Sequence, residues 1–370
     1  MYSLVQCTAE EILPVLIKNH SKFDLLLYDP PYNTKSSKFR YNDNKTRSEW
    51  LAWLKTIFEQ SYQVMADTSA IIVNIDHREL FYLGALLDEI FGEENRIGII
   101  TWQKSVAKSQ SLTISTTTEY ILCYKKGDLQ RYGGVKQKVE RLNKYKNTDN
   151  DPKGRWTVAD PTAPGNDINK QFGLLSQTGQ IYYPKARNWA YSKEQIIEWM
   201  SVYGDCSIKS KDNREYIHVN YTKTPKFLPH MFFLKDGKGR PMVKKYLDGD
   251  EMCPHTFWSA AEFGHTKGAT IELQNIMGKD IEFGTPKPLK LIETLLHIFS
   301  PKNGRVLDVF AGSGTTGHAV INLNKNGDNR TFLLSEPGSK DDQYCSTLTK
   351  ERLEKFGKID FSSCIKDFSG

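Results

Sequence analysis

Short apolar runs alternate with helical patterns in the first third of the chain, and this alternation constrains the fold more than any other feature. The run FDLLLY occupies residues 23–28 and the run AIIVNI occupies residues 70–75. After each run, apolar side chains recur with helical spacing, over 48–62 and over 80–91. Continuous apolar strands joined by helices are typical of a mainly parallel sheet that helices cover on both faces. We therefore expect an α/β fold.

The alternation stops in the middle of the chain. Between residues 128 and 255 the periodicity is poor, and Gly, Pro, Asn and Lys are frequent. Only 193–201 has a clear helical pattern there, so we expect an irregular inserted module with a small aromatic core. The α/β pattern returns at about residue 256. The expected organisation is an α/β domain whose two parts are 1–127 and 256–370, with the insert 128–255 between them.

The positive charge of the chain is concentrated in this insert. The formal net charge is +6, and residues 128–250 hold 22 Lys and Arg against 14 Asp and Glu. The same segment holds 16 of the 43 aromatic residues. Cations neutralise phosphates and aromatic rings stack on exposed bases, so a nucleic-acid surface is one interpretation. A solvated, loop-rich insert explains the charge equally well.

Other compositional features argue against several classes of protein. No apolar stretch approaches the roughly 20 residues that span a membrane, and the first residues do not resemble a signal peptide. The six cysteines form no C-x-x-C pair, and the histidines at 218, 230, 255 and 265 lack metal-ligand spacing. We therefore expect a cytoplasmic protein without membrane contact, disulfides or a metal site.

The tetrapeptide Asp29-Pro30-Pro31-Tyr32 directly follows the first apolar run. Open α/β sheets bind ligands at the carboxyl ends of their strands. The Asp29 carboxylate can accept one hydrogen of an aromatic amine, and a carbonyl preceding proline can accept the other, which favours a tetrahedral nitrogen with an available lone pair. Tyr32 offers a flat face for a base removed from a duplex. A simple strand-ending turn would also account for Asp-Pro-Pro.

A second motif, DVFAGSGTT at 308–316, joins an expected strand at 305–310 to an expected helix. Gly312 and Gly314 allow the backbone to approach a ligand closely, and the following helix offers free N–H groups. The Thr-Thr turn departs from the glycine spacing of a dinucleotide loop. Glu336 ends the next strand, where a carboxylate can accept hydrogen bonds from both ribose hydroxyls of a nucleoside.

With these motifs the chain resembles the amino-directed DNA methyltransferases of the permuted β-type order, and in particular the modification subunits of type III restriction–modification systems. In that order the DPPY half comes first, then a target-recognition insert, then the cofactor half. The resemblance covers about two thirds of the chain and fails between 128 and 255. It is carried by DPPYNT (29–34), FRYND (39–43), VNIDHRE (73–79), ITWQK (100–104), TTEYILCYKK (117–126), FGTPKPLKLIETLLHIFS (283–300), VLDVFAGSGTTGHAV (306–320) and NRTFLLSEP (329–337).

The resemblance implies a Rossmann-like, S-adenosylmethionine-dependent methyltransferase that flips adenine out of double-stranded DNA and methylates N6. It also implies a homodimer and a restriction (helicase–nuclease) subunit as a partner. The implied catalytic residues are Asp29, Pro30, Pro31 and Tyr32. The implied cofactor-binding residues are Asp308, Phe310, Gly312, Gly314, Thr315 and Glu336, with Thr285 and Lys287 at the cofactor's carboxylate end.

Two departures from the family pattern stand out. Cys7 replaces an aspartate that could bind the cofactor's adenine, which puts that contact in doubt. The chain is also shorter than most type III modification subunits, which puts their partner-docking segments in question.

Several alternatives remain open at this point. The amino group could belong to cytosine N4, to RNA or to a protein amide, or the chain could read DNA without catalysis. Asp at position 29 favours adenine, and the basic insert favours duplex DNA. Cys253-Pro254 would suit attack on a cytosine ring only if it lay in the catalytic half. Asp76 either lines the site or caps a helix, and Trp102 is either a second stacking surface or part of the core.

Overall fold

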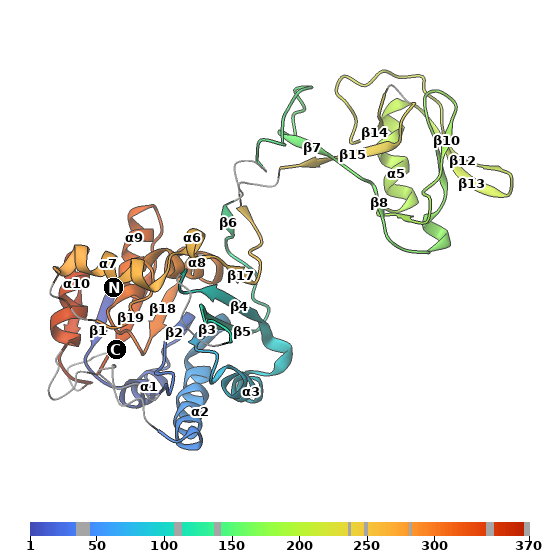
Figure 1. Cartoon of the computed structure of the whole chain (residues 1–370). Coiled ribbons are helices and arrows are strands. Elements are labelled where there is room, and N and C mark those ends of the chain that lie inside the picture. The colour runs from blue at the N-terminus through green and yellow to red at the C-terminus, as the bar shows by residue number, and fades with distance from the viewer. Residues whose placement is uncertain are drawn as a thin grey trace. The chain divides into compact units, whose positions relative to one another are not determined.

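The structure is a computed structural model, and it describes residues 1–34, 45–106, 113–136, 142–235, 238–247, 251–279, 281, 283–337 and 344–365. The segment FRYND at 39–43 lies outside the described residues. The chain divides into two compact units (Figure 1). Unit 1 comprises residues 1–135 and 253–370, and unit 2 comprises residues 136–252. The sequence pattern placed these two boundaries near residues 128 and 255.

Unit 1 contains, in its described residues, a nine-stranded sheet. Neighbouring strands run parallel except β5, which is antiparallel to both β3 and β4. The expected α/β fold with a mainly parallel sheet is therefore confirmed. In sheet order the strands are β17 (Phe257–Trp258), β4 (Arg96–Gln103), β5 (Thr118–Lys126), β3 (Met65–Ile75), β2 (Phe23–Tyr28), β18 (Arg305–Asp308), β19 (Thr331–Ser335), β1 (Tyr2–Val5) and β20 (Asp360–Ser362).

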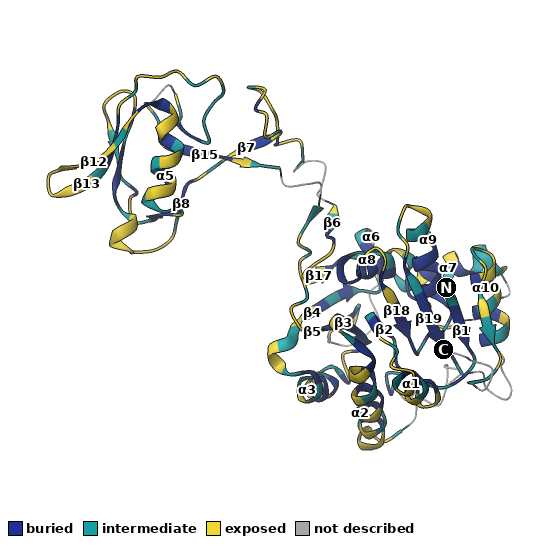
Figure 2. Ribbon diagram, turned by 180° about the vertical axis from the view of Figure 1, so that it is seen from behind, coloured by how far each residue is buried: buried dark blue, intermediate teal, exposed yellow. Residues whose placement is uncertain are grey.

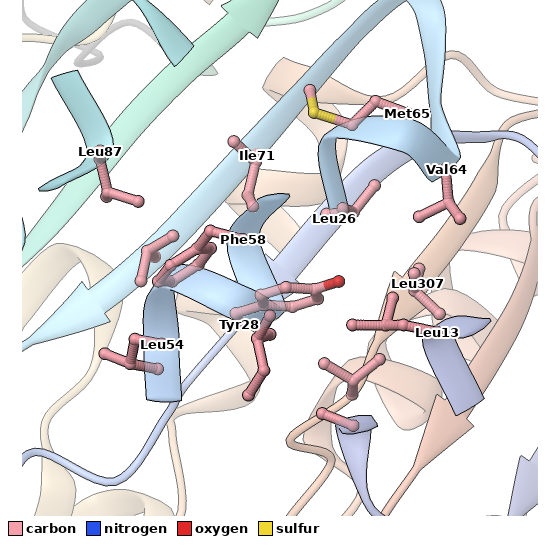
Figure 3. Close-up of a cluster of buried hydrophobic side chains, with 14 of the residues drawn as sticks. Leu13, Leu26, Tyr28, Leu54, Phe58, Val64, Met65, Ile71, Leu87 and Leu307 are labelled. Atoms are coloured by element: carbon pink, nitrogen blue, oxygen red, sulfur yellow. The ribbon is translucent and has the colours of Figure 1, made fainter. Parts of the chain in front are cut away.

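Helices cover both faces of this sheet. One face packs against α1 (Ala9–Lys18), α2 (Arg47–Val64) and α3 (Leu80–Phe91). Figure 3 shows the centre of that layer, where Phe58 and Leu54 of α2 meet Tyr28 of β2. The other face packs against α6 (Ala260–Phe263), α8 (Leu289–Phe299), α9 (Thr315–Lys325) and α10 (Lys350–Glu354). The remaining helical segments in the described residues of unit 1 are η1 (Glu93–Asn95), α7 (Thr266–Met277) and the π-helical η4 (Cys345–Thr349).

The start of α2 illustrates how the sequence sets an element that positions the site. The Thr46 hydroxyl accepts a hydrogen bond from the backbone N–H of Glu49, whose carboxylate accepts from the backbone N–H of Thr46. This capping box satisfies two N–H groups that the helix leaves unpaired. Helix α2 consequently begins at Arg47, one residue before the helical pattern in the sequence.

Unit 2 has a core of its own and more strands than its sequence pattern suggested. Trp189, Met200 and Ile217 are buried in this core, and Figure 2 shows that helix α5 of this unit carries both buried and exposed residues. Its strands are only two to six residues long, so alternation is hard to recognise in the sequence. In the described residues they are β7 (Trp156–Ala159), β8 (Thr162–Ala163), β9 (Gly173–Leu175), β10 (Ile181–Tyr182), β11 (Asn188–Trp189), β12 (Cys206–Lys211), β13 (Arg214–Val219), β14 (Met231–Phe233) and β15 (Pro241–Tyr246), with helical segments η2 (Ile168–Lys170), α5 (Lys193–Met200) and η3 (Ser201–Tyr203).

Two short strands, β6 (Val135–Lys136) and β16 (Glu251–Met252), form a separate two-stranded sheet. Across the described part of the chain, no helix has both the length and the apolar character that crossing a membrane requires.

Candidate active site

A cavity of about 820 Å³ lies where β2, β18 and β19 end. These strands are mutually parallel neighbours, so their carboxyl ends meet at one edge of the sheet. Most of the residues that the sequence singled out line this cavity, namely Asp29, Pro31, Thr285, Lys287, Asp308, Phe310, Gly312, Thr315 and Glu336. Pro30, Tyr32 and Gly314 do not line the cavity, although each is adjacent in the sequence to residues that do.

Hydrogen bonds from neighbouring elements hold the loop after β2. The Trp50 indole donates to the Pro31 carbonyl (2.8 Å), and the Arg78 guanidinium donates to the Thr34 carbonyl (3.3 Å). At the strand end, the Asn74 amide donates to the Tyr28 carbonyl (3.1 Å). The Pro30 carbonyl accepts no hydrogen bond from any residue in the described ranges. It is therefore available as the second acceptor that the sequence pattern suggested.

The Asp29 carboxylate is bound by two side chains of this site. The Lys287 ammonium donates to both of its oxygens, at 2.8 and 2.6 Å, and the Tyr32 hydroxyl donates to Oδ1. Lys287 Nζ also lies 2.9 Å from the Tyr32 hydroxyl. Burial favours the neutral form of Lys287, but the charges of Asp29 and Glu119 outweigh this and raise its pKa.

Sequence reasoning missed the Glu119 carboxylate. It lies 3.0 Å from Lys104 Nζ, 3.4 Å from the Tyr32 hydroxyl and 3.5 Å from Lys287 Nζ. The antiparallel pairing of β5 with β3 brings Glu119 to this edge, since its neighbour Tyr120 lies opposite Ile75. The only sign of Glu119 in the sequence was the segment TTEYILCYKK, which resembles the family, but this segment does not by itself indicate which strand β5 pairs with.

Asp76 lies in the same network of charges. Lys104 Nζ is 3.4 Å from its carboxylate, and Arg78 donates to it from both the guanidinium (2.8 Å) and the backbone N–H (3.2 Å). Burial acts to raise the pKa of Asp76, but the hydrogen bonds from Arg78 and the charge of Lys104 outweigh it and lower that pKa. Asp76 thus caps a turn and also helps to fix Lys104 beside Glu119.

The glycine loop after β18 is shaped around two carboxylates. Gly312 and Gly314 have φ angles of +50° and +79°, in the left-handed region that favours glycine. The Gly312 backbone N–H donates to Glu336 (2.6 Å), and the Thr316 hydroxyl donates to Asp308 (2.6 Å). The loop therefore presents its backbone and the Glu336 carboxylate to the same cavity.

Burial perturbs both of these carboxyl groups. It raises the pKa of Asp308 from 3.8 to about 7, against the opposing hydrogen bond from Thr316. It likewise raises the pKa of Glu336 from 4.5 to about 7, against the hydrogen bond from Tyr344. A ligand that brings hydrogen-bond donors or positive charge to this wall would favour the ionised form of both groups.

A buried arginine, which sequence reasoning also missed, holds the glycine loop through hydrogen bonds. Arg352 is 2% exposed, and its guanidinium donates to the Ser313 carbonyl and to the Thr315 hydroxyl, each at 3.0 Å. Burial lowers the pKa of Arg352 to about 10. Because Arg352 follows η4, far along the chain from the loop, local sequence gave no sign of this contact.

The structure places the remaining candidate residues outside the site. Trp102 is fully buried and donates to the Gly264 carbonyl (3.0 Å), so it belongs to the core and not to a stacking surface. Cys253 is exposed and does not line the cavity. Cys7 does not line it either, while its neighbours Thr8, Ala9 and Glu10 do. Among the described residues, no group of three His, Cys, Asp or Glu could hold a metal ion.

Comparison with known families decides the relationship. The sequence model of the N6/N4 DNA methylase family matches residues 23–352, which include both motifs and the insert. The chain belongs to this family of DNA methyltransferases. The resemblance that the two motifs indicated is thereby confirmed.

Individual relatives cover most of the chain at modest identity. The type II methyltransferase M.KpnI of Klebsiella pneumoniae is 28% identical over 85% of this chain and 75% of its own length. The StyLTI Mod subunit of Salmonella typhimurium is 28% identical over 84% of this chain, and the EcoP15I Mod subunit of Escherichia coli is 27% identical over 94%. These matches span 48% and 62% of the two type III Mod subunits.

Proposed function

We propose that this DNA methylase transfers a methyl group from S-adenosylmethionine to the N6 amino group of adenine in duplex DNA, after the base has been flipped out. The observation that carries the proposal is the position of Asp29. Its carboxylate lines a cavity that also contains Gly312 and Glu336, and it is fixed there by Lys287 and Tyr32. An acceptor for the target amine and a nucleoside-binding loop therefore share one cavity.

The residues of the cavity fit S-adenosylmethionine. The Glu336 carboxylate lines the cavity beside the Gly312 backbone, where it can accept hydrogen bonds from ribose hydroxyls. A Cβ at Gly312 would come within 3.3 Å of Phe283, so a side chain there would crowd the cavity wall. Phe310 supplies an apolar wall, while Thr285 and Lys287 lie where a carboxylate would be neutralised. When bound, the cofactor supplies an electrophilic methyl group. The role of the chain is to hold that group opposite the target nitrogen.

Asp29 and the Pro30 carbonyl are proposed to accept the two hydrogens of the target amine. An aromatic amine is a weak nucleophile because its lone pair is delocalised into the ring, and two acceptors favour a tetrahedral nitrogen. Hydrogen bonds that strengthen as this geometry develops stabilise the transition state more than the bound substrate. The ring of Tyr32 is proposed to stack on the flipped base, while its hydroxyl keeps Asp29 oriented.

Two arguments favour adenine over cytosine as the target. The site has Asp at position 29, and two of the relatives are Mod subunits of type III systems. The family also includes N4 enzymes, so cytosine N4 is the alternative target, followed by RNA and by a DNA-reading role without catalysis. Incubation of the purified protein with labelled S-adenosylmethionine and, in parallel, duplex DNA or RNA, followed by nucleoside analysis, separates these. Label in N6-methyl-2′-deoxyadenosine supports the proposal, and label in N4-methyl-2′-deoxycytidine, label only in RNA or no label contradicts it.

Unit 2 is proposed to select the DNA sequence. It is a compact unit with its own core, and it holds the excess positive charge of the chain. Replacing residues 136–252 by the matching segment of a relative should change the methylated sequence and leave cofactor affinity nearly unchanged. A chimera that kept the original sequence specificity would contradict this assignment.

The Mod-subunit relatives also motivate two proposals about assembly, a homodimer and a restriction (helicase–nuclease) subunit as partner. Light scattering of the purified chain tests the first proposal. Affinity purification from the native cell tests the second, which recovery of the chain without a second large subunit would contradict.

A further inference from the structure

Two buried amide oxygens of the cavity wall, Asn33 Oδ1 and Asn74 Oδ1, accept no hydrogen bond from any described residue. Asn33 is 6% exposed and Asn74 is 1% exposed, and both residues line the cavity. A buried acceptor without a donor destabilises the folded state, so such atoms are rare unless a ligand or water satisfies them. The two oxygens therefore indicate where a molecule in the cavity presents hydrogen-bond donors.

The backbone fixes the direction of the Asn74 oxygen. The Asn74 amide nitrogen donates to the Tyr28 carbonyl, and only the nitrogen of an amide can do so. The oxygen must therefore point away from that carbonyl. Strands β2 and β3 are parallel with Tyr28 opposite Val73, so Asn74 is the next residue on β3 and Asp29 is the residue that directly follows β2. The free oxygen belongs to the same part of the cavity wall as the Asp29 carboxylate.

The backbone at Asn33 also serves to place its side chain. Its φ angle is +54°, a left-handed conformation that asparagine adopts more readily than most residues. The residue directly follows Tyr32, and its side chain is buried although it lies in a loop. Asn33 is therefore a buried polar residue of the loop, and it lines the cavity.

The charges around these oxygens define the ligand group. Asp29 and Asp308 add carboxylates to the same cavity, and Lys287 contributes an ammonium bound to Asp29. An α-amino acid has the complementary pattern, an ammonium one carbon away from a carboxylate. The same cavity contains Glu336 and Gly312, which the proposed function assigns to the cofactor, so the amide oxygens belong to the cavity that the cofactor would occupy.

We propose that Asn74, with Asn33, accepts hydrogen bonds from the α-ammonium group of S-adenosylmethionine. The proposal rests on the proposed function, because it assumes that this cofactor occupies the cavity. It adds two binding residues to those that the motifs identify. A hydrogen bond to a charged group is worth enough to change affinity by about tenfold or more.

The test compares two ligands by isothermal titration calorimetry on the full chain. One is S-adenosylhomocysteine, and the other is its desamino analogue, which keeps the carboxylate but lacks the ammonium. Asn74→Leu should weaken S-adenosylhomocysteine about tenfold and leave the analogue nearly unchanged. Asn74→Asp loses the same amide donor to Tyr28 but keeps an acceptor, so it should keep the preference for the ammonium. Asn33→Gly suits the left-handed backbone and should also reduce the preference.

Gln60 provides a matched control. Its Oε1 atom is also buried and accepts no hydrogen bond within the described residues, but Gln60 lies on α2 and does not line the cavity. Gln60→Leu should leave both affinities unchanged. The proposal is overturned if Asn74→Leu weakens both ligands equally, which indicates a structural role, or weakens neither, which indicates that the oxygens bind only water. A wild-type chain that binds neither ligand would instead overturn the proposed function.

Discussion

The Lys287 ammonium lies 2.8 and 2.6 Å from the two carboxylate oxygens of Asp29, although 258 residues separate them in the sequence. Asp29 follows β2 and Lys287 shortly precedes α8, so this ion pair joins the two sequence segments of unit 1. The resemblance to the family implied that Lys287 lies at the cofactor's carboxylate end. In the structure Lys287 contacts Asp29 and also lines the cavity, and it therefore neighbours both proposed ligand groups.

This ion pair predicts energetic coupling between the two residues. Asp29→Asn leaves the buried Lys287 ammonium with less counter-charge and should lower the free energy of unfolding by about 2–4 kcal/mol. Lys287→Met should also destabilise the protein, but the double variant should lose less than the sum of the two. Urea titrations of the four proteins measure this coupling.

The exposed pair Lys55–Glu89 is the control for that cycle, because its atoms lie as close, at 2.6 Å, while both side chains are largely exposed. Its coupling should stay below about 1 kcal/mol. Strictly additive effects at Asp29 and Lys287 would show that their ion pair contributes nothing to stability.

A second prediction separates the ring of Tyr32 from its hydroxyl. Tyr32→Phe keeps the stacking face but removes the hydrogen bond to Asp29, worth about 1 kcal/mol, so the methylation rate should fall about fivefold. Tyr32→Ala also removes stacking worth roughly 1–3 kcal/mol, so it should lower the methylation rate much further. Single-turnover methylation gives the rates, and 2-aminopurine at the target position reports base flipping.

Asp29→Ala is the reference variant for that series. Loss of a charged acceptor that acts in the transition state should cost on the order of 3 kcal/mol, or about a hundredfold in rate, while flipping and DNA binding persist. Near-normal turnover by Asp29→Ala, or equal losses for Tyr32→Phe and Tyr32→Ala, would show that the roles are wrongly assigned.

A third prediction concerns protons. Burial raises the pKa of Asp308 and of Glu336 to about 7, so both carboxyls are partly protonated in the free protein at neutral pH. Ribose hydroxyls and a cationic ligand favour the ionised forms and lower both pKa values in the complex. Binding of S-adenosylhomocysteine near pH 7 should therefore release protons, and affinity should rise as the pH increases from 6 to 8.

Calorimetry in two buffers of different ionisation enthalpy counts those protons. Glu336→Gln removes one of the titrating groups, so it should reduce the number released and flatten the pH dependence. Proton uptake on binding, or the same release from Glu336→Gln, would contradict the assignment of Glu336 to the ligand.

The sequence predicted those parts of the site whose chemistry is local. Asp29 and Glu336 each follow an apolar strand, and Gly312 follows a third, so each could be placed at the carboxyl edge of a parallel sheet. Glu119 and Arg352 could not be found in this way. Glu119 reaches the site through the antiparallel pairing of β5, and Arg352 reaches the glycine loop from a helix more than thirty residues later. Such contacts depend on tertiary packing, which a periodicity argument does not contain.

Short elements account for most of the missed secondary structure. Strand β20 has three residues and is a strand only because it pairs with β1, so no periodicity in the sequence marks it. Strands β8, β10 and β11 of unit 2 have two residues each. Alternation over two or three residues cannot be distinguished from chance, whereas the buried aromatic core of unit 2 was anticipated from composition.

The last prediction concerns the positive charge of unit 2, which does not all face solvent. Lys244 is 1% exposed and forms 2.6 Å ion pairs with Asp149 and Asp151, so it cannot bind a phosphate. Lys209, Lys211 and Arg214 are exposed on the β12–β13 hairpin (Figure 2). If this hairpin contacts the DNA backbone, changing the three residues to Gln should reduce the slope of log affinity against log salt by about 2–3.

Two variants sharpen this test. The exchange of Lys209 and Lys211 to Arg and of Arg214 to Lys keeps the charge, and it should keep the salt slope. Lys244→Met leaves Asp149 and Asp151 without their counterion, so it should lower the stability of unit 2 and, at temperatures where the unit stays folded, leave the slope unchanged. Fluorescence anisotropy with labelled duplex DNA over a range of salt concentrations measures all of these slopes. Each phosphate contact that is lost reduces the number of counterions released on binding, and this lowers the slope. An unchanged slope for the triple Gln variant would therefore show that the phosphate contacts lie elsewhere.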